Sequence, residues 1–233
     1  MLRVAPSNIL LQVLFFLPAL VIAFTLHEAS HALVANLNGD PTAKNQGRLT
    51  LNPIRHLDVL GLVMIAFVGI GYAKPVPINA GNLRGQWSRL LVALAGPGAN
   101  LVLAIVASIP LKLIAAGTPA GFLNPPMCSL TAAPIDIVRT ELTYIYTLNL
   151  LLMVFNLLPI PPLDGFELVR TVLRRSNPRL LFQIESNRQS IYVVALLLFL
   201  LVPTALFYVI LLIVNPVTLL LGVPIYTGFW PCA

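Results

Sequence analysis

The stretch Phe24-Thr25-Leu26-His27-Glu28-Ala29-Ser30-His31 places a His-Glu-x-x-His pattern inside an apolar run that continues from residue 9 to residue 37. Residues four apart on an α-helix lie on the same face, so we expect His27 and His31 to direct two imidazole rings at one point. A zinc site needs this arrangement. Glu28 then lies about 100° further round the helix. From there its carboxylate can activate a water molecule without binding the metal, which makes Glu28 the candidate catalytic base.

The position of this pattern in an apolar segment favours function over chance. The chain contains only three His and four Glu among its 233 residues. An ionisable side chain inside a membrane span is costly unless it faces a cavity or a partner, and such residues usually mark functional sites. The alternative is that the two His and the Glu satisfy one another inside a helix bundle that binds no metal.

The composition indicates an all-α polytopic membrane protein. Hydrophobic residues make up 58% of the chain and charged residues 9%, with a mean hydropathy of +0.90. Soluble domains carry about 25% charged residues. No basic face with interleaved aromatic residues is present, which excludes nucleic acid as a partner. The two Cys, Cys128 and Cys232, are too few for a disulfide framework; they either pair or remain as two buried thiols.

The apolar runs predict about four full transmembrane helices plus one re-entrant segment. Four runs approach or exceed the length of a span, namely residues 8–37, 87–116, 141–158 and 190–214. The run 59–71 is too short to cross and suits a re-entrant segment. Residues 47–53 alternate polar and apolar and residues 72–79 are rich in Pro, so both are expected to form short membrane-associated β elements. We expect one integral-membrane domain over residues 1–233, with its core at 8–170 and a C-terminal helix and tail at 190–233.

The distribution of Lys and Arg predicts the orientation of the chain. With residues 59–71 re-entrant, eleven of the fourteen Lys and Arg lie on one side of the membrane, whereas only Arg3 lies clearly on the other. The positive-inside rule then places both termini outside and the His-Glu-x-x-His pattern towards the cytoplasm. A full crossing by 59–71 would divide the positive residues between the two sides and remove this asymmetry.

A third metal ligand is expected at the end of the third long run. Catalytic zinc sites use three protein ligands and leave one position open. Asp164 follows a Pro-rich segment at residues 159–162 and reaches the same depth as the two His. His56 and Glu167 are the rival ligands. Asp164 instead has a structural role if it pairs with Arg170 or Arg174.

The chain resembles the site-2 protease family of intramembrane zinc metalloproteases. Three motifs in the family's order support this resemblance: His27-Glu28-x-x-His31, Gly96-Pro97-x-x-Asn100, and Asn156-x-x-Pro159 followed by Leu163-Asp164-Gly165. The resemblance implies that His27, His31 and Asp164 bind one Zn²⁺, that Glu28 activates water, and that Asn156 holds substrate near the metal. Asn100 is expected to pack near the site, and we group it with Asn156 as a candidate substrate-binding residue. The chain looks like a minimal form of the family, without a PDZ or CBS domain.

The resemblance predicts an intramembrane zinc metalloendopeptidase that cuts peptide bonds in or near transmembrane segments. Its partners are the lipid bilayer and single-span membrane protein substrates, and the minimal size suggests, by analogy, a prokaryotic plasma membrane. The alternative is a non-proteolytic metal-binding membrane protein such as a sensor or a transporter. Glu28 argues against it, because metal binding alone does not need that carboxylate, and no repeated site typical of transport is visible. A structural scaffold is the third and weakest hypothesis.

Overall fold

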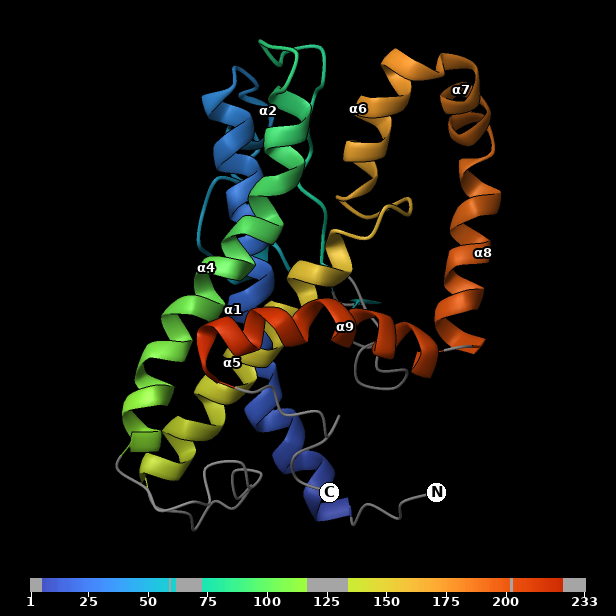
Figure 1. Cartoon of the computed structure of the whole chain (residues 1–233). Helices are drawn as coiled ribbons and strands as arrows, with labels where there is room; N and C mark the ends of the chain where they lie inside the picture. Colours follow the sequence, from blue (N-terminus) through green and yellow to red (C-terminus); the bar gives the residue numbers. More distant parts are fainter. Residues whose placement is uncertain (1–5, 59, 62–72, 117–133, 202, 224–233) are drawn as a thin grey trace.

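Three long helices form the body of the molecule. The structure, a computed structural model, describes residues 6–58, 60–61, 73–116, 134–201 and 203–223. Helices α1 (Pro6–Leu37), α4 (Ser88–Ala116) and α5 (Pro134–Asn156) pack against one another in pairs (Figure 1). They are the three helices of the described part that are long and apolar enough to cross a membrane. The all-α multi-pass fold and three of the expected spans are thereby confirmed.

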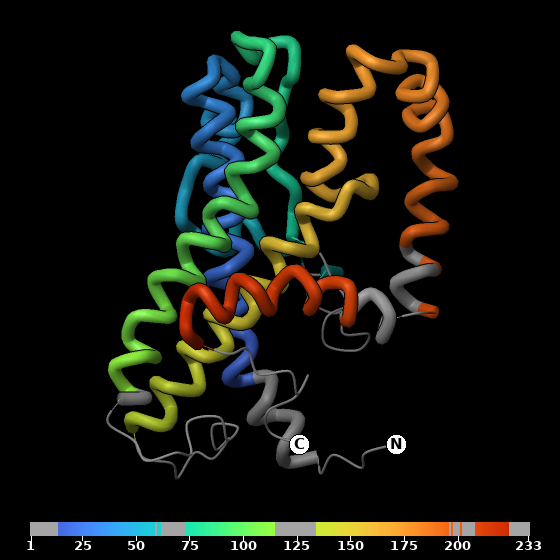
Figure 2. The backbone as a smooth tube through the Cα atoms, viewed as in Figure 1, coloured from blue at the N-terminus to red at the C-terminus, as the bar shows by residue number. Residues whose placement is uncertain are grey.

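The path of these helices brings distant segments to one end of the bundle. The backbone trace shows α1 and α5 running in one direction and α4 in the other (Figure 2). The end of α1, the start of α4 and the chain after α5 therefore lie at the same end. The segments at this end hold eleven of the fourteen Lys and Arg of the chain, as the sequence predicts.

Small side chains allow α4 to approach α5 closely. Ala104 and Ala107 of α4 pack in one buried cluster with Tyr146 and Leu150 of α5. The alanine side chain is small, so two helix backbones can approach each other closely. Helices in a membrane associate through such close packing, because lipid removes the hydrophobic driving force between them. Val214 belongs to the same cluster, so α9 (Pro203–Leu221) packs on this side of the bundle.

The fourth expected span, residues 190–214, is divided between two helices. Helix α8 (Arg188–Leu201) ends just before Pro203, and α9 begins at that residue and runs across the bundle against α5 (Figure 1). Proline has no N–H and clashes with the preceding turn, which explains the break. The 14 residues of α8 correspond to a helix of about 21 Å, against a hydrocarbon core of about 30 Å. A single fourth span is therefore not confirmed.

Helix α5 begins earlier than its apolar run. The sequence indicates a loop up to residue 138 and an apolar span over 141–158, whereas the helix starts at Pro134. Proline is favourable at a first helical position, and Asp136 in the first turn complements the helix dipole. Asp136 also pairs with Arg139 at 3.1 Å. Polar residues thus extend a helix that hydropathy alone would begin later.

The expected β elements are not found in the described residues. The segment 47–53 contains turns and leads from α2 (Thr42–Asn45) into the short helix η1 (Pro53–Arg55). Residues 73–79 are extended but belong to no strand of the described residues. The N–H of Lys74 donates to the carbonyl of His56 at 2.8 Å, and the Arg48 guanidinium donates to the carbonyls of Lys74 (2.5 Å) and Pro75 (3.2 Å). Pro75 and Pro77 supply no N–H, which also opposes a ladder.

The basic segment after Asp164 folds into two short helices, α6 (Phe166–Ser176) and α7 (Pro178–Ser186). The Arg175 guanidinium lies 5.1 Å from the centre of the Trp87 ring and donates to Gln86 at 2.9 Å, so α6 is held against the start of α4. The expected re-entrant segment at 59–71, apart from residues 60–61, lies outside the described residues. Cys128 and Cys232 also lie outside them.

Candidate metal centre

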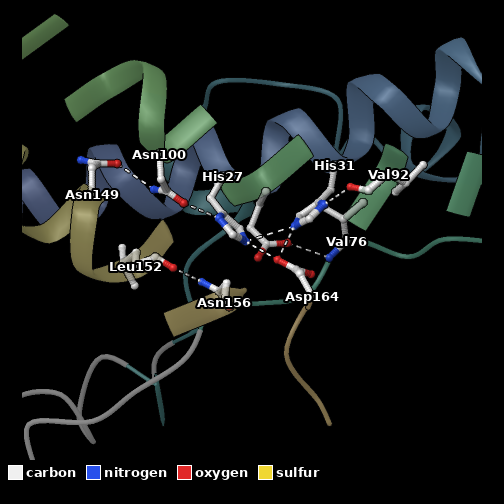
Figure 3. A network of polar contacts seen from close by, with 10 residues as sticks. His27, His31, Val76, Val92, Asn100, Asn149, Leu152, Asn156 and Asp164 are labelled. Atoms are coloured by element: carbon white, nitrogen blue, oxygen red, sulfur yellow. Dashed lines mark hydrogen bonds and ion pairs between the residues drawn. The ribbon is translucent and has the colours of Figure 1, made fainter. Parts of the chain in front are cut away.

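His27 and His31 of α1 face Asp164, which lies just beyond α5 (Figure 3). Oδ2 of Asp164 lies 3.2 Å from Nε2 of His27 and 3.4 Å from Nε2 of His31. The two Nε2 atoms are 3.0 Å apart. Among the described residues these three side chains form a group whose ligand atoms all lie within 4.8 Å of one another. The fold thus brings together the three ligands that the sequence indicates.

The other ring nitrogen of each His is bonded to α4. Nδ1 of His31 donates to the carbonyl oxygen of Val92 at 2.7 Å, and Nδ1 of His27 lies 2.6 Å from Oδ1 of Asn100. A carbonyl oxygen only accepts, so the proton of each neutral ring lies on Nδ1 and the lone pair lies on Nε2. Such bonds fix both the tautomer and the direction of a metal-binding imidazole.

The resulting group of atoms fits a cation. Oδ2 of Asp164 is buried and has no hydrogen-bond partner among the described residues. An aspartate side chain, with an ordinary pKa of about 3.9, is a carboxylate at neutral pH. Two nitrogen lone pairs and one carboxylate oxygen then converge with no proton between them. Two imidazoles and one carboxylate are a typical set of protein ligands for a catalytic zinc ion, which keeps a further coordination position open.

Gly96 leaves the space that this group needs. A Cβ atom at Gly96 would lie 2.4 Å from Nε2 of His31 and 2.5 Å from Nε2 of His27. Any other residue on this face of α4 would therefore occupy the space beside the two ligand atoms. The glycine of the Gly96-Pro97-x-x-Asn100 motif serves the metal centre as well as the packing of α4 on α1.

A tight loop returns Asp164 to the end of α5. Proline at 159, 161 and 162 prevents the helix from continuing, and the N–H of Gly165 donates to the carbonyl of Asn156 at 2.7 Å. A Cβ atom at Gly165 would lie 2.2 Å from the carbonyl oxygen of Leu157. The absence of a side chain at Gly165 therefore allows the loop to close and fixes the position of its neighbour, Asp164.

Glu28 lies beside this group, on the helix that carries both His. Its Oε2 accepts a hydrogen bond from the backbone N–H of Val76 at 3.0 Å, and its charge interacts with His31. The side chain is half-buried and is not one of the three grouped ligands. This is the place expected of a base that acts next to a metal rather than on it.

The two Asn that the sequence singles out differ in their contacts. Nδ2 of Asn156 donates to the carbonyl of Leu152 within α5 at 3.0 Å, and the side chain remains partly exposed near Asp164 (Figure 3). Asn100 is fully buried behind His27, and both ends of its amide are bonded within the protein, to His27 and to Asn149. Asn100 therefore supports the ring of His27, one of the three candidate metal ligands.

The rival ligands lie elsewhere. His56 is fully buried, and its Nε2 bonds to the carbonyl of Thr50 at 2.8 Å. Glu167 pairs with Arg170, which also donates to Glu185 at 2.8 Å. Arg170 is thus engaged by two other carboxylates and not by Asp164. Neither His56 nor Glu167 belongs to the grouped ligands of the described residues.

Sequence reasoning missed three supporting residues: Val92, Asn149 and Val76 in its contact with Glu28. Val92 acts through its carbonyl, which every residue carries, and Val76 through its N–H, which every residue except proline carries, so nothing in the sequence marks them. Asn149 does carry a signal, because an amide inside an apolar span requires a partner.

Comparisons with known proteins identify the family of the chain. The model of the family described as peptidase family M50 matches residues 15–201. YwhC of Bacillus subtilis (strain 168), whose name describes a zinc metalloprotease, is 41% identical over 155 residues, covering 66% of this chain and 67% of that protein. Rip2 of Mycolicibacterium smegmatis, with a name of the same kind, is 32% identical over 170 residues, covering 69% of this chain. Rip2 of Mycobacterium tuberculosis (strain H37Rv) is 32% identical over 166 residues.

The match spans 58% of the length of both Rip2 proteins. No solved structure matches the chain significantly. The family match covers most of the chain and includes all three grouped ligands, Glu28 and Asn156. The chain therefore belongs to peptidase family M50, the site-2 protease family.

Proposed function

We propose that His27, His31 and Asp164 bind one zinc ion and that Glu28 is the catalytic base of an intramembrane endopeptidase. As a member of the site-2 protease family, the chain is a zinc metalloprotease of membranes. One observation supports the assignment of its residues above all others. Three acceptor atoms converge within 4.8 Å, and the carboxylate oxygen among them is buried without a hydrogen bond.

Each residue then has a distinct task. When bound to the three ligands, zinc supplies Lewis-acid chemistry, which polarises a carbonyl group and makes water acidic. Glu28 accepts the proton of the attacking water and delivers it to the amine nitrogen that leaves. Asn156 uses one amide proton on Leu152, so its Oδ1 is available to accept a hydrogen bond from a substrate peptide N–H. Family membership does not favour the alternative of a non-proteolytic sensor or transporter.

The substrates proposed here are single-span membrane proteins. A peptide bond inside a helix is already hydrogen-bonded and shielded, so the substrate must unwind before it reaches the metal. The Pro-rich loop after α5 is irregular backbone next to the site, and irregular backbone is tolerated at membrane depth where it lines a cavity or is buried in protein. The chain near residues 157–165 is therefore the proposed entry for an unwound segment.

We further propose that the site faces the cytoplasmic side of a prokaryotic plasma membrane. The ligands lie towards the end of the bundle that holds most of the Lys and Arg, and the positive-inside rule assigns that end to the cytoplasm. Single-cysteine variants tested with a membrane-impermeant thiol reagent, in a background without Cys128 and Cys232, would check this orientation. Asn52→Cys, between α2 and η1, should not react with the reagent added outside, and its labelling from outside would contradict this orientation.

The decisive experiment measures metal per chain in the purified protein. We expect about one zinc in the wild type, as for a mononuclear catalytic site, and its loss in both His31→Ala and Asp164→Ala. Glu167→Gln is the matched control, because this nearby carboxylate pairs with Arg170 and should leave the metal in place. Glu28→Gln should keep the metal and stop cleavage of a single-span reporter. Metal that survives both ligand substitutions would overturn the assignment.

A further inference from the structure

A row of two buried amides, Asn100 and Asn149, connects the metal centre to α5 (Figure 3). Nδ2 of Asn149 donates to the carbonyl of Ile145 at 2.7 Å, and Oδ1 of Asn149 accepts from Nδ2 of Asn100 at 2.7 Å. Oδ1 of Asn100 in turn lies 2.6 Å from Nδ1 of His27. Asn100 and Asn149 have no exposed surface. The row therefore runs through three helices without contact with solvent.

The direction of this row is set at its far end. The Ile145 carbonyl can only accept, so Asn149 must present its NH₂ group there and its oxygen to Asn100. Asn100 must then present its NH₂ group to Asn149 and its oxygen to His27. The oxygen requires a donor, so the proton of the His27 ring lies on Nδ1. Reversing one amide would oppose two acceptors or two donors in a buried site, which is unfavourable.

We propose that Asn149 is a positioning residue of the metal centre, which through Asn100 selects the His27 tautomer whose Nε2 is free to bind the metal. This inference rests on the proposed metal site. Without Asn149, the Asn100 amide can rotate and offer its NH₂ group to Nδ1 of His27. The ring proton then moves to Nε2, where it points at Asp164 and His31 and competes with the metal.

The second ligand supplies an internal reference. His31 donates to the backbone carbonyl of Val92, which cannot reverse its role as an amide can. The tautomer of His31 is therefore independent of Asn149. A general disturbance of the fold would affect both rings, whereas loss of the amide row should affect His27 alone.

The size and burial of Asn149 argue against a role in packing only. Leucine has the same number and branching of side-chain heavy atoms and is more favourable in an apolar span, whereas a buried amide is costly unless it is fully bonded. Asn149 lies on α5 next to Leu150, a fully buried core residue. The hydrogen bonds of Asn149 to Asn100 and to the Ile145 carbonyl therefore offset the cost of burying its amide.

The tautomers can be read directly from the ring nitrogen shifts in metal-free protein labelled with ¹⁵N-histidine, because the chain has only three His. We expect the wild-type His27 and His31 rings to carry their proton on Nδ1. In Asn149→Leu, the His27 ring should move to the Nε2–H form and His31 should not. Zinc affinity should fall by about 10- to 100-fold, the usual effect of losing a partner of a metal-binding His.

Two further variants make the test specific. Thr140→Val is the matched control. Thr140 is also fully buried on α5, and among the described residues its hydroxyl bonds only to the Asp136 carbonyl of its own helix. It should change neither tautomer nor affinity. In an Asn100→Asp background, both oxygens at position 100 accept, so there is no amide to reverse. Adding Asn149→Leu to Asn100→Asp should therefore leave the His27 tautomer unchanged.

The outcomes separate this inference from the proposed function. An Nε2–H form of His27 in the wild type, or a His27 tautomer and zinc affinity unchanged in Asn149→Leu, would overturn the inference while the metal site stands. A wild-type protein that binds no zinc would overturn the proposed function instead. The tautomer measurement needs no metal and would still decide the role of Asn149 in that case.

Discussion

The backbone N–H of Val76 donates a hydrogen bond to Oε2 of Glu28 over 3.0 Å. This contact joins the candidate base on α1 to an extended segment 48 residues further along the chain. The segment is fixed in turn: the side chain of Val76 is buried against Ala32 and Ala43, and Arg48 holds the two preceding carbonyls. The direction of the Glu28 carboxylate is therefore set by residues 73–79 as well as by its own helix.

Replacing Val76 with proline should slow cleavage while the metal remains. The change removes the N–H that orients Glu28 and leaves the three ligands untouched. Small displacements of a catalytic group cost up to about 100-fold in rate, so we expect a loss between about 10- and 100-fold for a single-span reporter. Val76→Ala keeps the N–H and is the control. Equal rates in Val76→Pro and wild type, with equal zinc content, would contradict this role.

Gly96→Ala should abolish metal binding. The new methyl group would lie within 2.5 Å of Nε2 of both His, closer than real Cβ contacts allow. Gly98→Ala on the same helix provides a close control, because a Cβ atom at Gly98 would meet no atom of the described residues within 4 Å. Metal per chain should fall to background in the first variant and stay at the wild-type level in the second. Full zinc content in Gly96→Ala would show that α4 can move away from the His rings.

These features differ in how far the sequence predicts them. The His27–His31 pair depends only on helix geometry, so four-residue spacing is sufficient to predict it. Asp164 follows a Pro-rich segment at the expected depth, which distinguishes it from the rival ligands His56 and Glu167. The Val76–Glu28 and Asn100–Asn149 contacts join residues 48 and 49 positions apart. Periodicity carries no information about such pairs, because they depend on which helix faces lie together.

Two features of the fold differ from what local patterns indicate. Hydropathy continues through Pro203, so residues 190–214 read as one span with a kink at that proline, whereas α8 ends before it and α9 packs across α5. The segment 73–79 has the composition of an edge strand, but Arg48 and Glu28 occupy its peptide groups before another strand can. In the first case a proline interrupts the apolar run, and in the second tertiary contacts override a local pattern.

Asp40 should make the loop after α1 sensitive to acid. Its buried carboxylate accepts from the N–H of Asn79 at 2.6 Å and from Nδ2 of Asn82 at 3.0 Å. Burial raises the pKa of Asp40, but these bonds and those from Thr42 lower it below its ordinary value of 3.8. Because the folded-state pKa is depressed, the stabilisation is complete above pH 3.8 and is lost as the pH falls through the folded value.

Asp40→Asn tests this sign. The variant keeps the shape but loses an acceptor, which should cost about 1–3 kcal/mol at neutral pH. The difference in thermal unfolding midpoint between wild type and variant, measured without metal, should be full at about pH 6 and should shrink as the pH falls further below 3.8, as the linkage between protonation and stability requires. A difference that stays the same across this range would show that the charge of Asp40 is not involved.

Gly165→Ala should displace Asp164 and lower metal affinity. The added Cβ would meet backbone atoms of Leu157 and Leu158 at 2.2 to 2.6 Å, and backbone cannot yield as a flexible side chain does. The loop must therefore open, which breaks the Gly165–Asn156 hydrogen bond and moves the adjacent ligand. Gly81→Ala is the control, since only the side chain of Asn79 lies near it, at 3.2 Å. Zinc titration of both variants would compare the two losses. Equal affinities would mean that the position of Asp164 does not depend on this closure.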